Sequence, residues 1–196
     1  FGGAEGCVFS TAPGSQRVAM RCESEVGTLF FPAPTTSLDF GSSLEAIDNG
    51  GVSLLVGDSG LDGTGGLYVV PAAMNVMTAR IVTVTVAGAG RSAAMGARFG
   101  SAIASTVSGG VTRIAVSASG AGLVAIGSLD GAQTFTTQGC VDGGERIAMG
   151  SDADGTARVF VASGSEVRVH LLSSVSGGCG SMASRPAATA TLSCAG

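Results

Sequence analysis

Hydrophobic and polar residues alternate over short stretches of this chain, and glycine-containing turns separate the stretches. Arg80–Val86 alternates valine with threonine, and Val167–Leu172 alternates aliphatic with polar residues. A period of two residues is typical of β-strands that bury one face. Asp62-Gly63, Asp130-Gly131 and Asp154-Gly155 stand directly before further strands, and Asp-Gly favours tight hairpins. The pattern predicts an all-β protein of short strands and many turns.

Two short phrases recur along the chain at spacings of tens of residues. The first is Arg17-Val18-Ala19-Met20, repeated as Arg113-Ile114-Ala115-Val116 and Arg146-Ile147-Ala148-Met149, with looser copies at Ser53–Val56 and Leu123–Ile126. The second is Phe-Gly, at Phe1-Gly2, Phe40-Gly41 and Phe99-Gly100. Self-similarity at such spacings indicates a repeat architecture, in which each unit is one supersecondary element stacked on the next.

The repeats divide a single β-repeat domain, residues 1–196, into units. These lie near 1–38, 39–98, 99–139 and 140–175, and a tail follows at 176–196. The first unit has room for three strands and the others for four. Ala188–Ser193 in the tail fits one further strand, and our hypothesis is that this strand joins the first unit and closes a ring. A β-solenoid or a β-sandwich is the alternative all-β arrangement.

The spacing of these phrases resembles the FG-GAP repeat. The clearest copy is Phe40–Val70, with Phe40-Gly41-Ser42-Ser43 followed by Leu54–Gly57 and Gly65–Val70, and a second copy spans Phe99–Ser117. FG-GAP repeats build the β-propellers of integrin α-subunits and of secreted bacterial and fungal proteins, including lectins. The resemblance implies a propeller-like array of four-stranded antiparallel blades. Phe40, Gly41, Phe99 and Gly100 would be its structural positions.

The chain departs from that family in two ways. Family propellers usually have seven blades, whereas this chain has about four. The family also often has a calcium loop before the aliphatic strand, and here Asp48-Asn49-Gly50-Gly51 supplies too few of the oxygen ligands that calcium requires. Asp58, Asp62, Asp152 and Asp154 are weak metal candidates that we interpret as turn residues. No cofactor is predicted, and calcium is not supported.

Two other residue types are candidates for chemistry. Arg17, Arg113 and Arg146 begin what the repeat presents as equivalent strands, so they either bind carboxylates on one face of the ring or bond loop carbonyls between units. We favour the structural role. His170 is the only histidine of the chain. No nucleophile or orienting acid is placed beside it by any motif, so catalysis is not predicted.

The composition of the chain limits the classes of binding partner that we expect. Of 196 residues, 33 are glycine, 12% are charged, and the formal net charge is −4. The ten basic residues are all arginines and are scattered, which disfavours nucleic-acid binding because phosphate contacts need clustered cations. No apolar run is long enough for a transmembrane helix. The expected partner is therefore a protein or a glycan, with self-association or further blades of a parent chain as additional expectations.

Five cysteines favour disulfides and thus an oxidising, extracellular or cell-surface location. Cys7–Cys22 would close a hairpin in the first unit and Cys179–Cys194 would hold the tail, leaving Cys140 unpaired. Cys140–Cys179 is the alternative pairing. Together these features predict a non-catalytic binding or adhesion module. The alternative is a structural subunit of a self-assembling surface structure or filament, and a hydrolase on a propeller scaffold ranks last.

Overall fold

A computed structural model describes residues 7–12, 14–23, 29–32, 37–48, 52–70, 82–84, 96–129, 135–177, 179 and 185–193. Within these residues the regular structure consists of strands and three short 3-10 turns, without an α-helix. The predicted all-β class is confirmed. Phe1-Gly2, Asp130-Gly131, Cys194 and most of Arg80–Val86 lie outside the described residues, although Val82–Val84 forms a strand as predicted.

The strands form four antiparallel sheets, which we number in chain order. Sheet 1 contains β1 (Cys7–Thr11), β2 (Arg17–Cys22) and β3 (Leu29–Pro32). Sheet 2 contains β4 (Phe40–Asp48), β5 (Val52–Asp58), β6 (Gly66–Val70) and β7 (Val82–Val84). Sheet 3 contains β8 (Phe99–Ser108), β9 (Val111–Ala118), β10 (Leu123–Leu129) and β11 (Phe135–Asp142). Sheet 4 contains β12 (Arg146–Ser151), β13 (Ala157–Ser163), β14 (Glu166–Leu171) and β15 (Ala190–Ser193).

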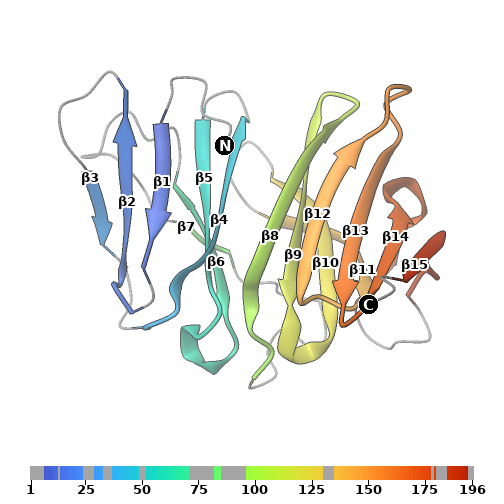
Figure 1. Ribbon diagram of the computed structural model, residues 1–196. Coiled ribbons are helices and arrows are strands. Elements are labelled where there is room, and N and C mark those ends of the chain that lie inside the picture. Colours follow the sequence, from blue (N-terminus) through green and yellow to red (C-terminus); the bar gives the residue numbers. More distant parts are fainter. Residues whose placement is uncertain are drawn as a thin grey trace.

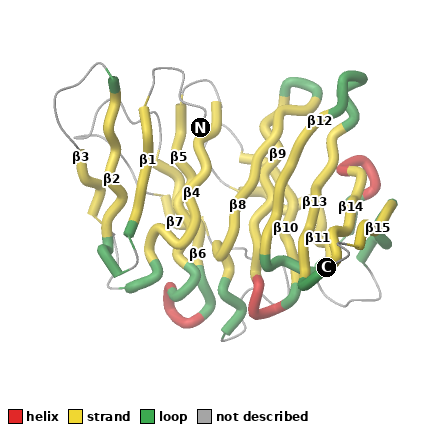
Figure 2. The backbone as a smooth tube through the Cα atoms, in the orientation of Figure 1, coloured by secondary structure: helices red, strands yellow, loops and turns green. Residues whose placement is uncertain are grey.

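Each sheet is a meander, since its strands lie side by side in the order in which they occur in the chain. The 3-10 turns η1 (Leu61–Gly63) and η2 (Ser119–Ala121) connect the second and third strands of sheets 2 and 3, and η3 (Leu172–Ser174) follows β14. The sheets are arranged one after another, with β8 in contact with both β4 and β12 (Figure 1). Figure 2 shows the same succession of strands joined by short turns.

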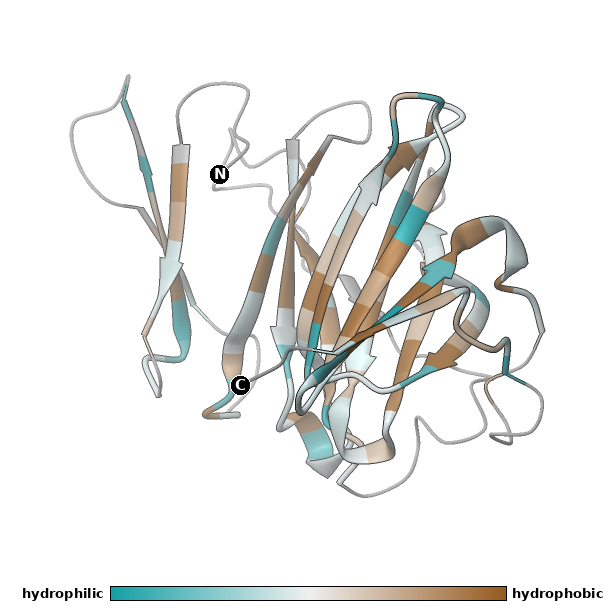
Figure 3. Ribbon diagram, turned by 45° about the vertical axis from the view of Figure 1, so that its right-hand side comes forward, coloured by the Kyte–Doolittle hydropathy of each residue, from teal (hydrophilic) through white to brown (hydrophobic). Residues whose placement is uncertain are grey.

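Apolar side chains fill the contact layer between neighbouring sheets, which we call a seam. Seam 1–2 contains Val18, Met20, Phe40, Leu54, Val56, Tyr68 and Val70. Seam 2–3 includes Ile47, Leu55, Leu67, Val69, Phe99, Ile114 and Val116, and seam 3–4 contains Ala115, Val124, Ile126, Val141, Val159, Val161 and Val175. Successive residues of a strand point to opposite faces, so the inner sheets are buried on both sides. In Figure 3 the strongly hydrophobic residues accordingly lie mainly in the strands.

The Phe-Gly phrase begins the first strand of sheets 2 and 3. Phe40 and Phe99 are each 2% exposed, and the Phe40 ring packs edge-on against Tyr68 with centroids 5.4 Å apart. Gly41 has φ +84° and Gly100 has φ +87°, and the strand register shifts just after each. A Cβ on Gly100 would lie 2.2 Å from the Gly66 carbonyl oxygen of sheet 2. Glycine is therefore required where the first strand of one sheet meets its predecessor.

The arginine phrase is only partly equivalent between units, and this corrects the sequence interpretation. Arg17 and Arg113 lie on β2 and β9, the second strands of their sheets, but Arg146 begins β12, a first strand. The true counterpart in sheet 4 is Arg158 on β13, where Val159 and Val161 are buried. A second strand is central to its meander, whereas β12 is an edge strand whose residues are half-buried or exposed.

The tail does not close a ring through the first sheet. β15 pairs antiparallel with β14, from Glu166↔Ser193 to Val169↔Ala190, so it completes sheet 4. The hypothesis that this strand joins the first unit is wrong. Residues 140–175 supply only three strands to sheet 4, and β15 from the tail is its fourth. Likewise β11 continues to Asp142, which places Cys140 inside sheet 3 and not at the start of the fourth unit.

Candidate ligand-binding site

A pocket of about 460 Å³ opens in seam 3–4. Its volume is within the range of small-molecule sites. Its polar lining comes from three sources: sheet 3, the β12–β13 turn and the segment after β14. The polar residues are Ser108, Arg113, Gln138, Thr156, Ser173 and Ser176. Leu172 and Val175 supply apolar wall. Hydroxyl, amide and guanidinium groups thus converge on one cavity.

The β12–β13 turn that carries Thr156 is held by its own hydrogen bonds. The Thr156 N–H donates to Asp154 Oδ1 at 2.9 Å, and the Asp152 N–H donates to the Thr156 carbonyl at 2.9 Å. Gly155 has φ +80°, which the turn requires. The hydrogen bond from Thr156 lowers the pKa of the Asp154 carboxyl below its ordinary value. The turn places Thr156 at the pocket.

The opposite wall follows β14. The Val175 N–H donates to the Leu172 carbonyl at 3.1 Å, and Ser174 Oγ donates to the Leu171 carbonyl at 2.8 Å. Val175 is buried in the apolar cluster of seam 3–4. This anchor holds Ser173 and Ser176 beside the pocket, with both side chains exposed.

Arg113 lies half-buried in the pocket lining and has no carboxylate partner among the described residues. The ion pairs of the described chain use other arginines: Arg158 with Asp152 at 2.5 Å, Arg168 with Glu166 at 3.3 Å, and Arg185 with Asp142. The described lining residues include no acid and no histidine. The acids of the adjoining β12–β13 turn are engaged elsewhere, Asp152 with Arg158 and Asp154 with the Thr156 N–H.

The structure does not bring the three predicted arginines together. The Arg17 guanidinium lies over the Phe30 ring of sheet 1, 4.6 Å from its centroid. Arg146 is exposed on the edge strand of sheet 4. Only Arg113 lies in the pocket, so a common arginine face on a ring is not formed.

The weak metal candidates occupy separate places. Asp58 is fully buried and accepts a hydrogen bond from Ser37 Oγ at 2.5 Å, whereas Asp62 is exposed in η1. Asp152 pairs with Arg158, and Asp154 caps its own turn. No group of three metal-ligating side chains occurs among the residues that the structure describes.

His170 is 2% exposed on β14, and its ring nitrogens have no side-chain hydrogen-bond partner within the described part of the chain. Burial lowers the pKa of the imidazole, and Arg168 adds to that effect, while the Ala187 backbone and Asp142 oppose it. The residue is a buried neutral side chain outside the pocket lining.

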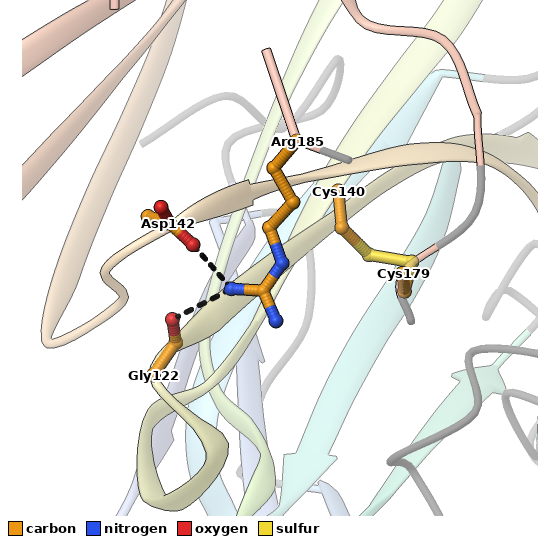
Figure 4. The surroundings of a disulfide bond; sticks show 5 residues. All are labelled: Gly122, Cys140, Asp142, Cys179 and Arg185. Atoms are coloured by element: carbon orange, nitrogen blue, oxygen red, sulfur yellow. Dashed lines mark hydrogen bonds and ion pairs between the residues drawn. A yellow bond between two sulfur atoms is a disulfide. The ribbon is translucent and has the colours of Figure 1, made fainter. Parts of the chain in front are cut away.

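The segment after β14 is fixed to sheet 3 before it returns to sheet 4, and we call its described residues, 172–177, 179 and 185–193, the strap. Cys179 of the strap forms a disulfide with Cys140 of β11. Nearby, Arg185 Nη1 donates to Asp142 and to the Gly122 carbonyl, and its side chain is fully buried (Figure 4). These contacts hold the strap that also forms one wall of the pocket.

The observed disulfide corrects the predicted pairing Cys179–Cys194. Cys179 pairs with Cys140, the alternative, and not with Cys194. Cys7 and Cys22 are directly opposite in the β1–β2 register, which is the backbone arrangement that the predicted hairpin pairing needs. Their side chains lie outside what the structure describes.

The sequence does not predict the pocket. Arg113 stands out as a repeat residue, but Gln138, Thr156 and Ser173 stand on three different segments with no shared motif. Serine and threonine are too common in this chain to signal a site. A comparison with protein-family models finds no match for this chain, and a search of curated proteins finds none either. None of the helical segments in the described chain is long and apolar enough to cross a membrane.

Proposed function

We propose that this chain is a non-catalytic binding module of the cell exterior that recognises a glycan through the pocket in seam 3–4. The four antiparallel sheets would be the blades of a propeller-like array, in keeping with the resemblance of Phe40–Val70 to FG-GAP repeats. The observation that carries the proposal is the convergence of hydroxyl, amide and guanidinium groups on one cavity. Such groups match the donors and acceptors of a sugar.

Two further observations support the proposal. The Cys140–Cys179 disulfide fits an oxidising compartment, where secreted and surface proteins reside. The pocket walls are also held in advance by the strap and the β12–β13 turn, which lowers the entropy cost of binding. Function resides in the site and not in the fold, so the pocket is where the proposal has to be tested.

The test is a glycan array followed by calorimetry on Gln138→Ala and Ser173→Ala. Both side chains are exposed in the pocket lining, so these variants should fold normally. Each is expected to weaken glycan binding about fivefold or more, since a lost hydrogen bond is worth about 1 kcal/mol. Ser10→Ala, an exposed serine of sheet 1, is the matched control. Binding that ignores both pocket variants, or no glycan bound at all, contradicts the proposal.

A second candidate function, self-assembly, is favoured by the outer face of sheet 4. The strand register places Phe160 beside Val169, and Val167 beside Leu192, on the same face. Leu192 is 58% exposed. Light scattering over a range of concentrations tests this: assembly should weaken in Leu192→Glu but not in Leu38→Glu, whose side chain is exposed in a loop. A monomer at every concentration overturns it.

A further inference from the structure

The charge balance of the pocket indicates which ligand it takes. Arg113 is the one charged residue of the described pocket lining. The residue is half-buried and has no carboxylate partner within the described residues. An unpaired charge in partly desolvated surroundings binds a counter-ion more strongly than a fully solvated one does.

A guanidinium selects the chemistry of that counter-ion. It is always protonated, and its planar fork of N–H donors matches the two oxygens of a carboxylate. The chain as a whole carries a formal charge of −4, so its long-range field does not attract anions. Selection for an acidic ligand must therefore come from the pocket itself.

The other lining residues indicate which groups the rest of the ligand carries. Gln138 offers both amide donors and an acceptor, and Ser173 offers a hydroxyl that donates or accepts. The Thr156 hydroxyl bonds to Asp154, so its oxygen is left to accept. A ligand with several hydroxyl groups satisfies these residues, whereas a fatty acid or another purely apolar acid does not. Among the described residues the apolar wall consists of Leu172, Val175 and the small Ala157.

We propose that the pocket in seam 3–4 binds a carboxylate-bearing sugar, with Arg113 holding the carboxylate and Gln138, Thr156 and Ser173 holding ring hydroxyls. This inference rests on the proposed glycan-binding function and narrows it to acidic saccharides. Arg113 is then the residue that determines specificity, and the polar neighbours supply the general affinity for sugars.

The test is calorimetric titration with D-glucuronate, D-galacturonate and N-acetylneuraminate, each compared with its methyl ester. The ester keeps every hydroxyl and removes the charge. At least one acid is expected to bind about tenfold or more tightly than its ester, which is the size of one charge-assisted hydrogen bond. Arg113→Gln should abolish that preference, and Arg113→Lys should retain part of it because lysine keeps the charge but not the fork.

The matched control is Arg17→Gln. Arg17 occupies the corresponding phrase on the second strand of sheet 1 but lies over Phe30, away from the pocket. Its variant should keep the preference for the acid. Unfolding curves verify that the variants are folded. If Arg113→Gln does not fold, Arg113→Lys serves as the test.

The outcomes separate this inference from the function on which it rests. Equal affinity for acids and esters, with binding still weakened by Gln138→Ala, overturns the acidic-sugar assignment but keeps the glycan site. An acid preference that survives Arg113→Gln also overturns the assignment. If no sugar, acidic or neutral, binds, both proposals fail.

Discussion

Seam 2–3 and seam 3–4 join their sheets in different ways. In seam 2–3 the backbone at the start of β8 is held by sheet 2: the Phe99 N–H donates to the Thr64 carbonyl at 2.9 Å, and Ser43 Oγ donates to the Gly100 carbonyl at 2.7 Å. Seam 3–4 begins in a similar way, with Ser117 Oγ donating to the Gly144 carbonyl. Elsewhere it contains the pocket, whose lining includes Arg113 and Gln138.

This difference shows how a repeated fold acquires an individual site. Glycine contacts fix the distance between sheets, and they allow close approach wherever they occur. A site with its own chemistry can form where side chains, and not glycines, lie between the sheets. The strap strengthens this effect in seam 3–4, because it adds residues from outside the repeat to one wall. Four variants break or sharpen the comparison.

The largest effect is expected for Gly100→Ala in seam 2–3. Its Cβ would overlap the Gly66 carbonyl oxygen, and alanine is strained at φ +87°. We expect a loss of about 3 kcal/mol or more in the free energy of unfolding, measured by denaturant titration. Gly150→Ala is the control, since a Cβ there meets nothing within 4 Å, and it should change stability by less than about 1 kcal/mol. Equal losses in the two variants contradict the account of the seams.

Removal of the strap disulfide should have the next largest effect. The Cys140–Cys179 bond spans a sequence separation of 39 residues, and the double variant Cys140→Ala/Cys179→Ala is expected to lose about 2–4 kcal/mol. The same variant should weaken ligand binding, because the strap forms a pocket wall. Cys194→Ala is the control. Peptide mapping that finds Cys179 bonded to Cys194 would falsify this assignment.

Asp142→Asn tests the second anchor of the strap. Arg185 is fully buried at its side chain, and without Asp142 its charge would be left uncompensated. The expected loss is about 2–3 kcal/mol, below the usual figure for a buried pair because the Asp142 side chain is one-third exposed. Adding Arg185→Met should restore part of the loss, since the unpaired charge is then gone. A double variant less stable than the single one speaks against a buried pair.

The smallest effect concerns pH. Burial lowers the pKa of His170, so the folded protein binds fewer protons at this site than the unfolded chain does. The stability that depends on neutral His170 is present above the unfolded pKa of about 6.5 and is lost as the pH falls through the lower folded pKa. His170→Asn should flatten this part of the profile of melting temperature against pH. A slope unchanged in the variant contradicts the assignment.

The sequence predicted where strands occur better than it predicted which strands pair with one another. Asp154-Gly155, Phe-Gly and the described part of the valine–threonine alternation, Val82–Val84, are reliable signals because they reflect local backbone preferences. The phrase beginning at Arg146 misled because four residues do not distinguish an edge strand from a central one. The pairing of Cys179 and the position of β15 depend on how the strap returns to sheet 4. No local pattern encodes that path.

The pocket could not be predicted for the same reason. Arg113 was visible as a repeat residue, but its role follows from the lack of a nearby acid after folding. Gln138 and Ser173 become neighbours only because sheets 3 and 4 stack and the strap crosses between them. Such a site is a property of the seam and not of any segment.

The most direct test of the account is an amide NMR titration of the full chain with the tightest-binding acidic sugar. The account predicts shifts concentrated at Gln138, Thr156 and Ser173, on both sides of seam 3–4, with Ser10 of sheet 1 unmoved. Shifts that centre on another sheet, or none at saturating sugar, would contradict it.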